Sequence, residues 1–186
     1  MNKSVLYKTL KSIKQHIGEN GEISRWLPEG TIVKSIITFN EPTTSEKVKS
    51  FEEKWKLNFP EDYIEFLVSH NGGNMFSHPL YGGGIELLSL ERIDELYKIY
   101  KNLLPNGWIP IALEEGDEML LIDTNQCVRG NKESSYLYWS SLIDVRDEAI
   151  SLKANFELWL DRFYISQGNK YWEWMQFSVE RYYKYR

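Results

Sequence analysis

The sequence is short of several features that define whole classes of protein. It contains one cysteine, Cys127, so it cannot form an intramolecular disulfide, a CxxC redox pair or a cysteine-based zinc site. No run of about 18 apolar residues occurs, as a membrane-spanning helix requires. The first residues contain no continuous apolar segment of the kind found in secretory signals. These absences predict a cytoplasmic protein.

Positive charge is in the minority. The chain has 22 Lys and Arg residues against 27 Asp and Glu residues, which gives a formal net charge of −5. Binding to a phosphate backbone depends on releasing counterions through cationic side chains, so nucleic acid is not expected as a direct partner. An acidic surface instead favours rapid capture of a basic protein. Hydrophobic residues make up 42% of the chain, which predicts a folded protein.

Patterns that would indicate catalysis or a cofactor are also missing. His16, His70 and His78 form no HExxH pair, and the residues around Cys127 match no thiol-enzyme signature. No GxSxG occurs, and the glycines at 82–84 lack the Lys-Ser/Thr of a P-loop. We therefore predict no catalytic residue, no metal ligand and no cofactor. His70 is expected to be a packed or capping residue near a helix end.

The first 70 residues predict three helices and one strand. Pro42 to Glu46 reads as a helix start, with Thr43 and Glu46 at capping-box spacing. Pro60 suits the first position of a further helix, where two carboxylates meet the positive end of the helix dipole. The strand is expected over 31–39, because this segment is rich in β-branched residues. Apolar residues at helical spacing predict the first helix: Leu6, Leu10, Ile13 and Ile17.

The rest of the chain predicts alternating strands and helices. Asn71-Gly72-Gly73 should end a helix with a glycine in the left-handed conformation, followed by a mobile loop over 75–84. Pro110 lacks an N–H, so its strand should lie at a sheet edge or begin irregularly. Strands are expected at 85–90, 108–112, 119–123 and 136–139, and helices at 91–104 and 156–163. No repeat is present, so the order of elements predicts an α+β fold in a single domain, 1–186.

Two ordered motifs resemble a known family. The run 59–67, Phe-Pro-Glu-Asp-Tyr-Ile-Glu-Phe-Leu, followed by Asn-Gly-Gly at 71–73, resembles the opening signature of the SUKH superfamily. The strand 108–112, an acidic glycine turn and a second strand ending at Asp123 resemble its next signature. The resemblance covers about 40–165, which leaves a helical N-terminal extension over 1–39 and an aromatic-rich C-terminal extension over 166–186.

The resemblance implies a fold and a class of function. Members of the superfamily are bacterial immunity proteins and fungal regulators of cell-wall assembly, built on a mostly antiparallel sheet with helices packed against it. The resemblance therefore implies a non-catalytic immunity protein that inhibits a cognate polymorphic toxin, often a nuclease. A regulatory scaffold of the cell-wall type is the alternative, and a metal-dependent hydrolase is the less favoured one.

The acidic hairpin is the candidate partner-binding site. Its residues are Glu114, Glu115, Asp117 and Glu118, with Asp123 nearby. A nuclease holds phosphate and so presents a basic cleft, which these carboxylates would complement. The other interpretation is a solvated turn, because charged loop tips are common.

The C-terminal extension is rich in aromatic residues. They allow two interpretations: packing against the core as a terminal helix, which the near-helical spacing favours, or a stacking surface for a sugar or a partner. The aromatic residues are Tyr171, Trp172, Trp174, Phe177, Tyr182, Tyr183 and Tyr185.

Overall fold

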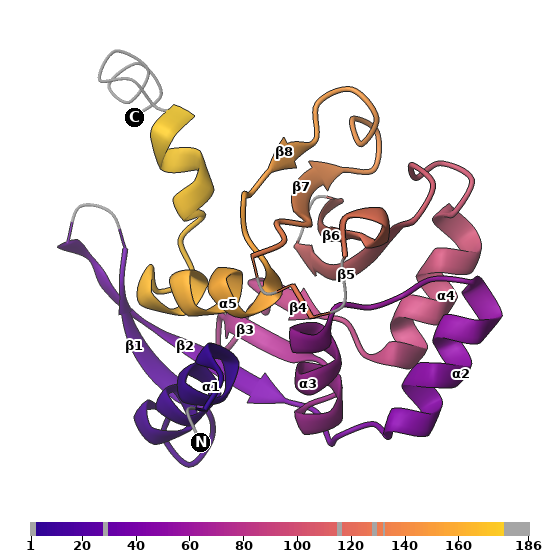
Figure 1. Cartoon of the computed structure of the whole chain (residues 1–186). Coiled ribbons are helices and arrows are strands. Elements are labelled where there is room, and N and C mark those ends of the chain that lie inside the picture. Colours follow the sequence, from indigo (N-terminus) through magenta and orange to yellow (C-terminus); the bar gives the residue numbers. More distant parts are fainter. Residues whose placement is uncertain (1–2, 28–29, 115–116, 128–129, 132, 177–186) are drawn as a thin grey trace.

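The described part of the chain builds one antiparallel sheet in which every strand pairs with its neighbours in sequence. The structure is a computed structural model that describes residues 3–27, 30–114, 117–127, 130–131 and 133–176. Within these residues the sheet has eight strands in the order β1 to β8 (Figure 1). They are β1 (Glu22–Trp26), β2 (Ile32–Phe39), β3 (Gly73–Ser77), β4 (Ile85–Leu87), β5 (Trp108–Glu114), β6 (Glu118–Asp123), β7 (Leu137–Ser141) and β8 (Ile150–Ser151).

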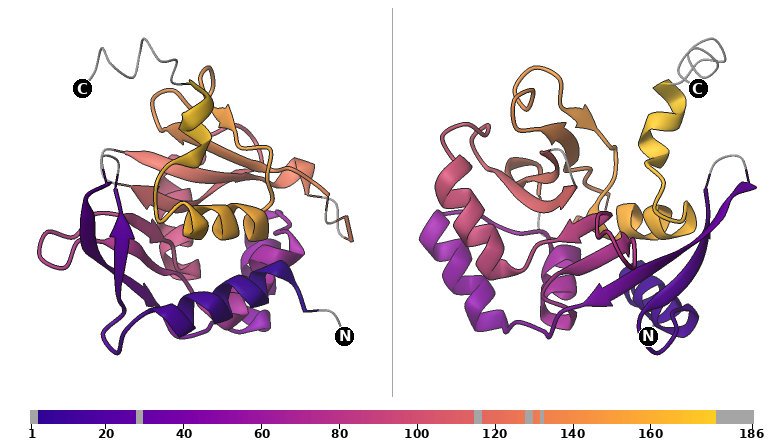
Figure 2. Two further views of the ribbon diagram at one scale, coloured as in Figure 1. Left: turned by 90° about the vertical axis from the view of Figure 1, so that its left-hand side faces the viewer. Right: turned by 180° about the vertical axis from the view of Figure 1, so that it is seen from behind.

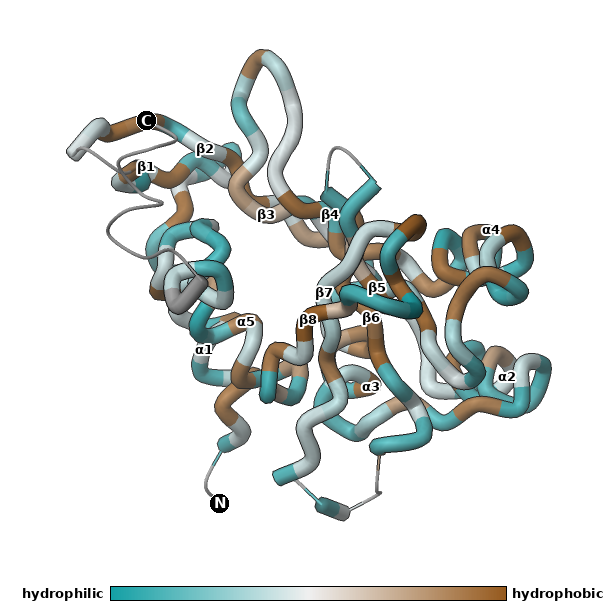
Figure 3. Tube along the Cα trace, turned by 90° about the horizontal axis from the view of Figure 1, so that it is seen from above, coloured by the Kyte–Doolittle hydropathy of each residue, from teal (hydrophilic) through white to brown (hydrophobic). Residues whose placement is uncertain are grey.

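Four of the α-helices form two pairs at opposite ends of the molecule (Figure 3), and α3 contacts one helix of each pair. The α-helices are α1 (Val5–His16), α2 (Ser45–Trp55), α3 (Glu61–Ser69), α4 (Leu90–Tyr100) and α5 (Phe156–Ile165), and the 3-10 helices are η2 (Thr124–Gln126) and η3 (Tyr171–Gln176). Helices α1 and α5 lie side by side, and α2 and α4 lie side by side at the opposite end of the molecule (Figure 3). η3 leaves the C-terminal end of α5 and runs away from α1 (Figure 2). The predicted α+β fold is thus confirmed.

The central strands are buried on both faces. Four consecutive residues of β5, Ile109 to Ala112, and five of β6, Met119 to Asp123, are buried, so neither strand shows the alternation of a half-exposed strand. On one side, α4 packs against β5. The core continues through aromatic contacts of α5, where the ring of Phe163 meets that of Phe76 in β3 with centroids 5.6 Å apart.

The helices begin close to the predicted positions. The Ser4 hydroxyl caps α1, which buries Leu6 and Ile13 as the periodicity predicts. The cap of α2 is Thr44, whose side chain accepts a hydrogen bond from the Lys47 N–H, and not Thr43, which is buried. Pro60 likewise is the cap of α3 and not its first helical residue. Both errors are shifts of one residue.

The Asn71-Gly72-Gly73 motif connects α3 to β3 and also contacts the start of α4. Helix α3 ends at Ser69 and His70 is extended, so no left-handed glycine closes the helix. Gly72 has φ +87°, and a Cβ there would lie 2.5 Å from the Leu87 carbonyl oxygen, so the motif needs glycine for a close backbone approach. The Asn71 side chain accepts a hydrogen bond from the Leu90 N–H and donates one to Glu91, which fixes the start of α4.

One prediction about the strands was wrong, and another was right in only one of its two alternatives. The segment 75–84 is not all loop, because Gly73–Ser77 forms β3 between β2 and β4, with Met75 and Phe76 buried. The strand that contains Pro110 is not at an edge, because β5 pairs with both β4 and β6. Its predicted irregularity is present, since the register with β6 shifts between Pro110 and Ala112.

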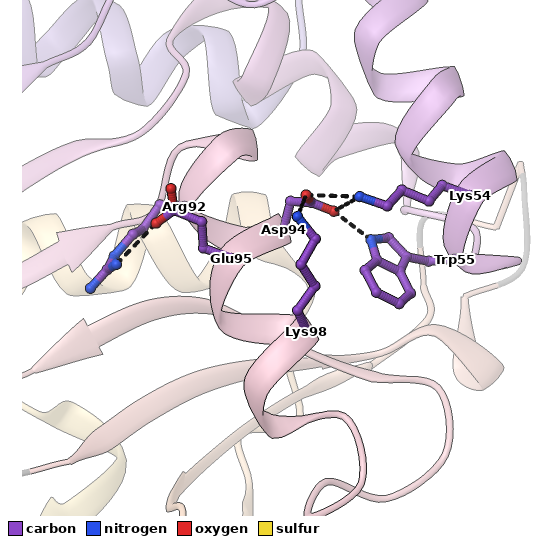
Figure 4. A network of polar contacts seen from close by, with 6 residues as sticks. All are labelled: Lys54, Trp55, Arg92, Asp94, Glu95 and Lys98. Atoms are coloured by element: carbon purple, nitrogen blue, oxygen red, sulfur yellow. Dashed lines mark hydrogen bonds and ion pairs between the residues drawn. The ribbon is translucent and has the colours of Figure 1, made fainter.

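Asp94 of α4 connects α4 to α2. Its carboxylate accepts hydrogen bonds from Lys54 Nζ at 2.6 Å and from the Trp55 indole N–H at 2.7 Å, both on α2, and it pairs with Lys98 at 2.6 Å (Figure 4). Partial burial alone would raise the pKa of Asp94, but the hydrogen bonds from Lys54, Lys98 and Trp55 outweigh it and lower the pKa to about 2. The charged form of Asp94 therefore stabilises the fold.

We expect Asp94→Asn to lower the free energy of unfolding at pH 7 by about 1–2 kcal/mol. The effect is limited to this size because Lys54 and Lys98 are half exposed, so solvent partly screens their charges. A lowered pKa gives stability that is present above pH 4 and lost as the pH falls toward 2. The difference between wild type and Asp94→Asn in urea denaturation should therefore shrink over that range. Glu95→Gln removes an exposed pair with Arg92 on the same helix and serves as the control. A pH-independent difference for Asp94→Asn would contradict this assignment.

Candidate functional site

The two ends of the acidic hairpin converge on a lysine from the C-terminal extension. Glu114 ends β5 and Glu118 begins β6, and the carboxylates of both pair with the Nζ atom of Lys170, Glu114 at 2.5 Å. Glu173 Oε1 lies 3.8 Å from the same Nζ. The ammonium also lies over the ring of Trp139 in β7, 5.3 Å from its centroid. We call these five residues the Lys170 site.

The Lys170 site is partly shielded from solvent. The exposed fractions of the Lys170, Glu114 and Glu118 side chains are 24%, 25% and 35%. Burial, together with the neighbouring Glu118, raises the pKa of Glu114 against the effect of Lys170. For Glu118, burial is outweighed by Lys170 together with polar contacts involving Glu114 and Trp139, and the pKa is lowered. The two carboxylates raise the pKa of Lys170 against the effect of burial. The lysine is therefore charged at neutral pH.

The remaining predicted site residues are placed differently. Asp117 is exposed in the turn between the two strands, with φ +70°, and Glu115 lies outside the described residues. Asp123, at the far end of β6, is 7% exposed. Its carboxylate accepts hydrogen bonds from the Asn125 N–H and the Gln126 amide and caps η2. A buried cap is poorly placed to contact a partner, so Asp123 does not share a surface with the hairpin.

The aromatic extension is part packed and part exposed. Trp172 is buried, and its ring lies 4.9 Å from that of Trp139 and 6.1 Å from that of Phe163. Trp174 is 61% exposed. The predicted packing therefore holds for Trp172 but not for Trp174. The other aromatic residues of the tail, Phe177, Tyr182, Tyr183 and Tyr185, lie outside the described residues.

A second polar cluster joins α3, β7 and the start of α5. Asp62, in the first turn of α3, accepts hydrogen bonds from the Tyr136 hydroxyl at 2.5 Å and from the Glu157 N–H at 3.0 Å. The Tyr136 hydroxyl in turn accepts one from the Phe156 N–H at 2.9 Å. Burial, the Asp62 charge and the hydrogen bond to Asp62 raise the pKa of Tyr136, against the smaller lowering effect of the Phe156 N–H. Beside the cluster lies a small pocket whose lining includes Glu61, Asp62, Glu65, Cys127, Tyr136 and Glu157.

The groups that line this pocket are engaged in the fold. Glu65 accepts a hydrogen bond from the Ser4 hydroxyl and Glu157 accepts one from the Leu6 N–H. Burial, followed by the charges of Asp123 and Asp62, raises the pKa of the Cys127 thiol to about 12. A thiol with that pKa is almost wholly protonated at neutral pH and is a poor nucleophile.

Histidine and the other metal-binding side chains form no site in the described part of the chain. No group of three His, Cys, Asp or Glu residues there has an arrangement that could hold a metal ion. The ring of His70 stacks on that of Phe39 with centroids 4.6 Å apart, and burial lowers its pKa, so the predicted packing role is confirmed. No helix among the described residues is long and apolar enough to cross a membrane.

The sequence matches a known protein family. Residues 42–162 match the SMI1 / KNR4 family (SUKH-1). The chain belongs to this family. The matched SUKH-1 region contains the whole Asp62 cluster, the acidic hairpin and Trp139, whereas Lys170 and Glu173 come after its end.

Two proteins from Bacillus subtilis (strain 168) are similar to this chain. The uncharacterized protein YobM is 34% identical over 188 residues, which cover 97% of this chain and 98% of its own length. The uncharacterized protein YnaB is 36% identical over 146 residues, which cover 78% of this chain and 92% of its own length. The similarity to YobM therefore includes both extensions of the SUKH-1 region.

We expect Tyr136→Phe to lower the free energy of unfolding by about 1–3 kcal/mol, because it removes a donor to Asp62 and leaves the buried Phe156 N–H without its acceptor. Tyr138→Phe, two residues further along the chain, is the matched control, since the Tyr138 hydroxyl accepts a hydrogen bond from the exposed Gln126 amide. Urea denaturation of both variants measures the difference. If both variants lost the same free energy of unfolding, the Asp62 cluster would stabilise the fold no more than the exposed Tyr138 hydrogen bond does.

Proposed function

We propose that this chain is an immunity protein that binds and inhibits a cognate polymorphic toxin, with a nuclease as the favoured target. Membership of the SUKH-1 family supports a binding role, because the superfamily includes bacterial immunity proteins. The observation that carries the proposal is the excess of negative charge around the β5–β6 hairpin. Among the described residues, three carboxylates there, those of Glu114, Glu118 and Glu173, lie within 4 Å of the one ammonium of Lys170, and Asp117 is exposed in the turn.

The chemistry of the proposed target fits this surface. A nuclease must hold a phosphodiester backbone, so its active cleft is lined by cationic side chains. An acidic protein that covers the cleft is attracted over a distance and excludes the substrate without any chemical step. In this proposal the chain acts in the cytoplasm of the producing or neighbouring cell, and catalysis has no part in its action.

A regulatory scaffold of the cell-wall-assembly type is the second candidate, because the same family includes such proteins. The two candidates differ in their partner. An immunity protein protects a cell that expresses the toxin encoded beside its gene, whereas a scaffold gives no protection. Co-expression with the protein of the neighbouring gene, with survival and pull-down as readouts, separates them. Failure of both binding and protection would overturn the immunity proposal.

The hairpin charges give a sharper test. We expect Glu115→Gln with Asp117→Asn to slow association with the toxin by about 3- to 10-fold at low salt, because steering depends on these charges. Both changes leave Glu114, Glu118 and Glu173 in place, which are the partners of Lys170 among the described residues, and asparagine tolerates the positive φ at position 117. Stopped-flow association measures the rate, and the difference should shrink at high salt.

The control for this test removes the same number of charges elsewhere. Glu19→Gln with Glu53→Gln neutralises two exposed carboxylates, one before β1 and one on α2. We expect this pair to change the association rate less than the hairpin pair does. Equal slowing by both pairs would show that only net charge matters and that the hairpin is not the binding surface.

A further inference from the structure

The C-terminal segment 169–174, which we call the strap, brings one cation to a site built by the sheet. Glu114, Glu118 and Trp139 project from β5, β6 and β7, three neighbouring strands. Lys170 enters from the strap, with its ammonium between the carboxylates and above the indole ring. Two carboxylates beside an aromatic face form a receptor for an ammonium or guanidinium group.

The charges at this receptor do not balance. Glu114, Glu118 and Glu173 all lie within 4 Å of the Lys170 Nζ atom. One ammonium offers one positive charge and three hydrogens to three carboxylates. Burial first, and then the like charge of Glu118, raises the pKa of both Glu114 and Glu173. A second cation, or one that makes more hydrogen bonds, would compensate the site better.

We propose that Glu114, Glu118 and Trp139 form a receptor for a single basic side chain of a protein partner, and that Lys170 fills this receptor in the free protein. The inference rests on the proposed function, because it takes the partner to be a basic protein. It goes further by naming the group that is recognised and the residue that the partner replaces. Arginine is the favoured ligand, since its guanidinium is planar and can bind both carboxylates.

Lys170 can leave without detaching the strap. The strap is held by Trp172, which is buried against Trp139 and Phe163, and by the turn in which Asn169 donates from its side chain to the Ser166 carbonyl oxygen. The lysine side chain has four rotatable bonds and its site is about one quarter to one third exposed, so a path to solvent exists. The ammonium can therefore move into solvent while the indole stays packed.

The test compares two lysine variants with the same net charge. Lys170→Ala empties the receptor, whereas Lys47→Ala breaks an exposed pair with Glu91 on α2 and α4. Heptalysine and heptaarginine at low ionic strength are the probes, and the indole N–H resonance of Trp139 reports occupation of the receptor. We expect Lys170→Ala to bind either peptide about tenfold more tightly than Lys47→Ala does. Adding Glu118→Gln to Lys170→Ala should abolish this gain.

Equal affinities of the two alanine variants, or a gain that survives Glu118→Gln, would overturn the proposal and leave Lys170 as an anchor of the strap. Lys170→Met keeps the aliphatic stem over Trp139 and replaces Lys170→Ala if alanine loosens the strap, which thermal unfolding would reveal. These outcomes do not depend on a toxin. Absence of a toxin partner would refute the proposed function alone, whereas failure of peptide selectivity would refute the receptor alone.

Discussion

The position of α5 depends on the carboxylate of Asp62, and much of the remaining structure depends on α5. The first N–H groups of a helix have no acceptor within the helix. In α5 these groups find acceptors in three other places: the Phe156 N–H in the Tyr136 hydroxyl, the Glu157 N–H in Asp62, and the Leu158 N–H in the Asn155 side chain. Because Asp62 also accepts from Tyr136, the residue directly before β7, this cluster joins α3 and α5 to the start of β7, and it is partly buried. Loss of one partner would leave buried polar groups unsatisfied, which is costly in a low-dielectric interior.

Both extensions of the family core attach to the helix that this cluster fixes. On one side, Glu157 accepts from the Leu6 N–H and Asp161 accepts from the Thr9 hydroxyl, so α1 is bound to α5 by polar contacts as well as by apolar packing. On the other side, Trp172 packs on Phe163. The extensions thus depend on residues within the SUKH-1 region for their placement, and they add α1, the strands β1 and β2, and the Lys170 ammonium, which this region does not supply.

The sequence predicted the elements that have a strong local pattern. All five α-helices and the hairpin of β5 and β6 follow from apolar spacing, caps and the acidic turn. The strand β3 was missed because Gly73 and Asn74 have low strand propensity, and because Phe76 has φ +58°, which puts both Met75 and Phe76 in the core and destroys the alternation. β8 has two residues, too few to show any period. These strands form because of partners distant in sequence, which no local pattern records.

The charge pairing of the candidate site likewise could not be predicted from local sequence. The hairpin carboxylates were predicted as a solvated or partner-facing group, but their cation comes from position 170, more than 50 residues later in the chain. Such a contact exists only once α5 has brought the strap over β7.

Asp123 is different, since an aspartate directly before Thr-Asn-Gln is a local capping signal that could have been recognised in the sequence. Once Asp123 is assigned to the cap, the acidic surface contracts to the hairpin and the strap. The shape of this surface then comes from the SUKH-1 sheet, while the positive charge at its centre, that of Lys170, comes from the extension. A change in the strap alone could therefore alter what the surface binds without disturbing the fold.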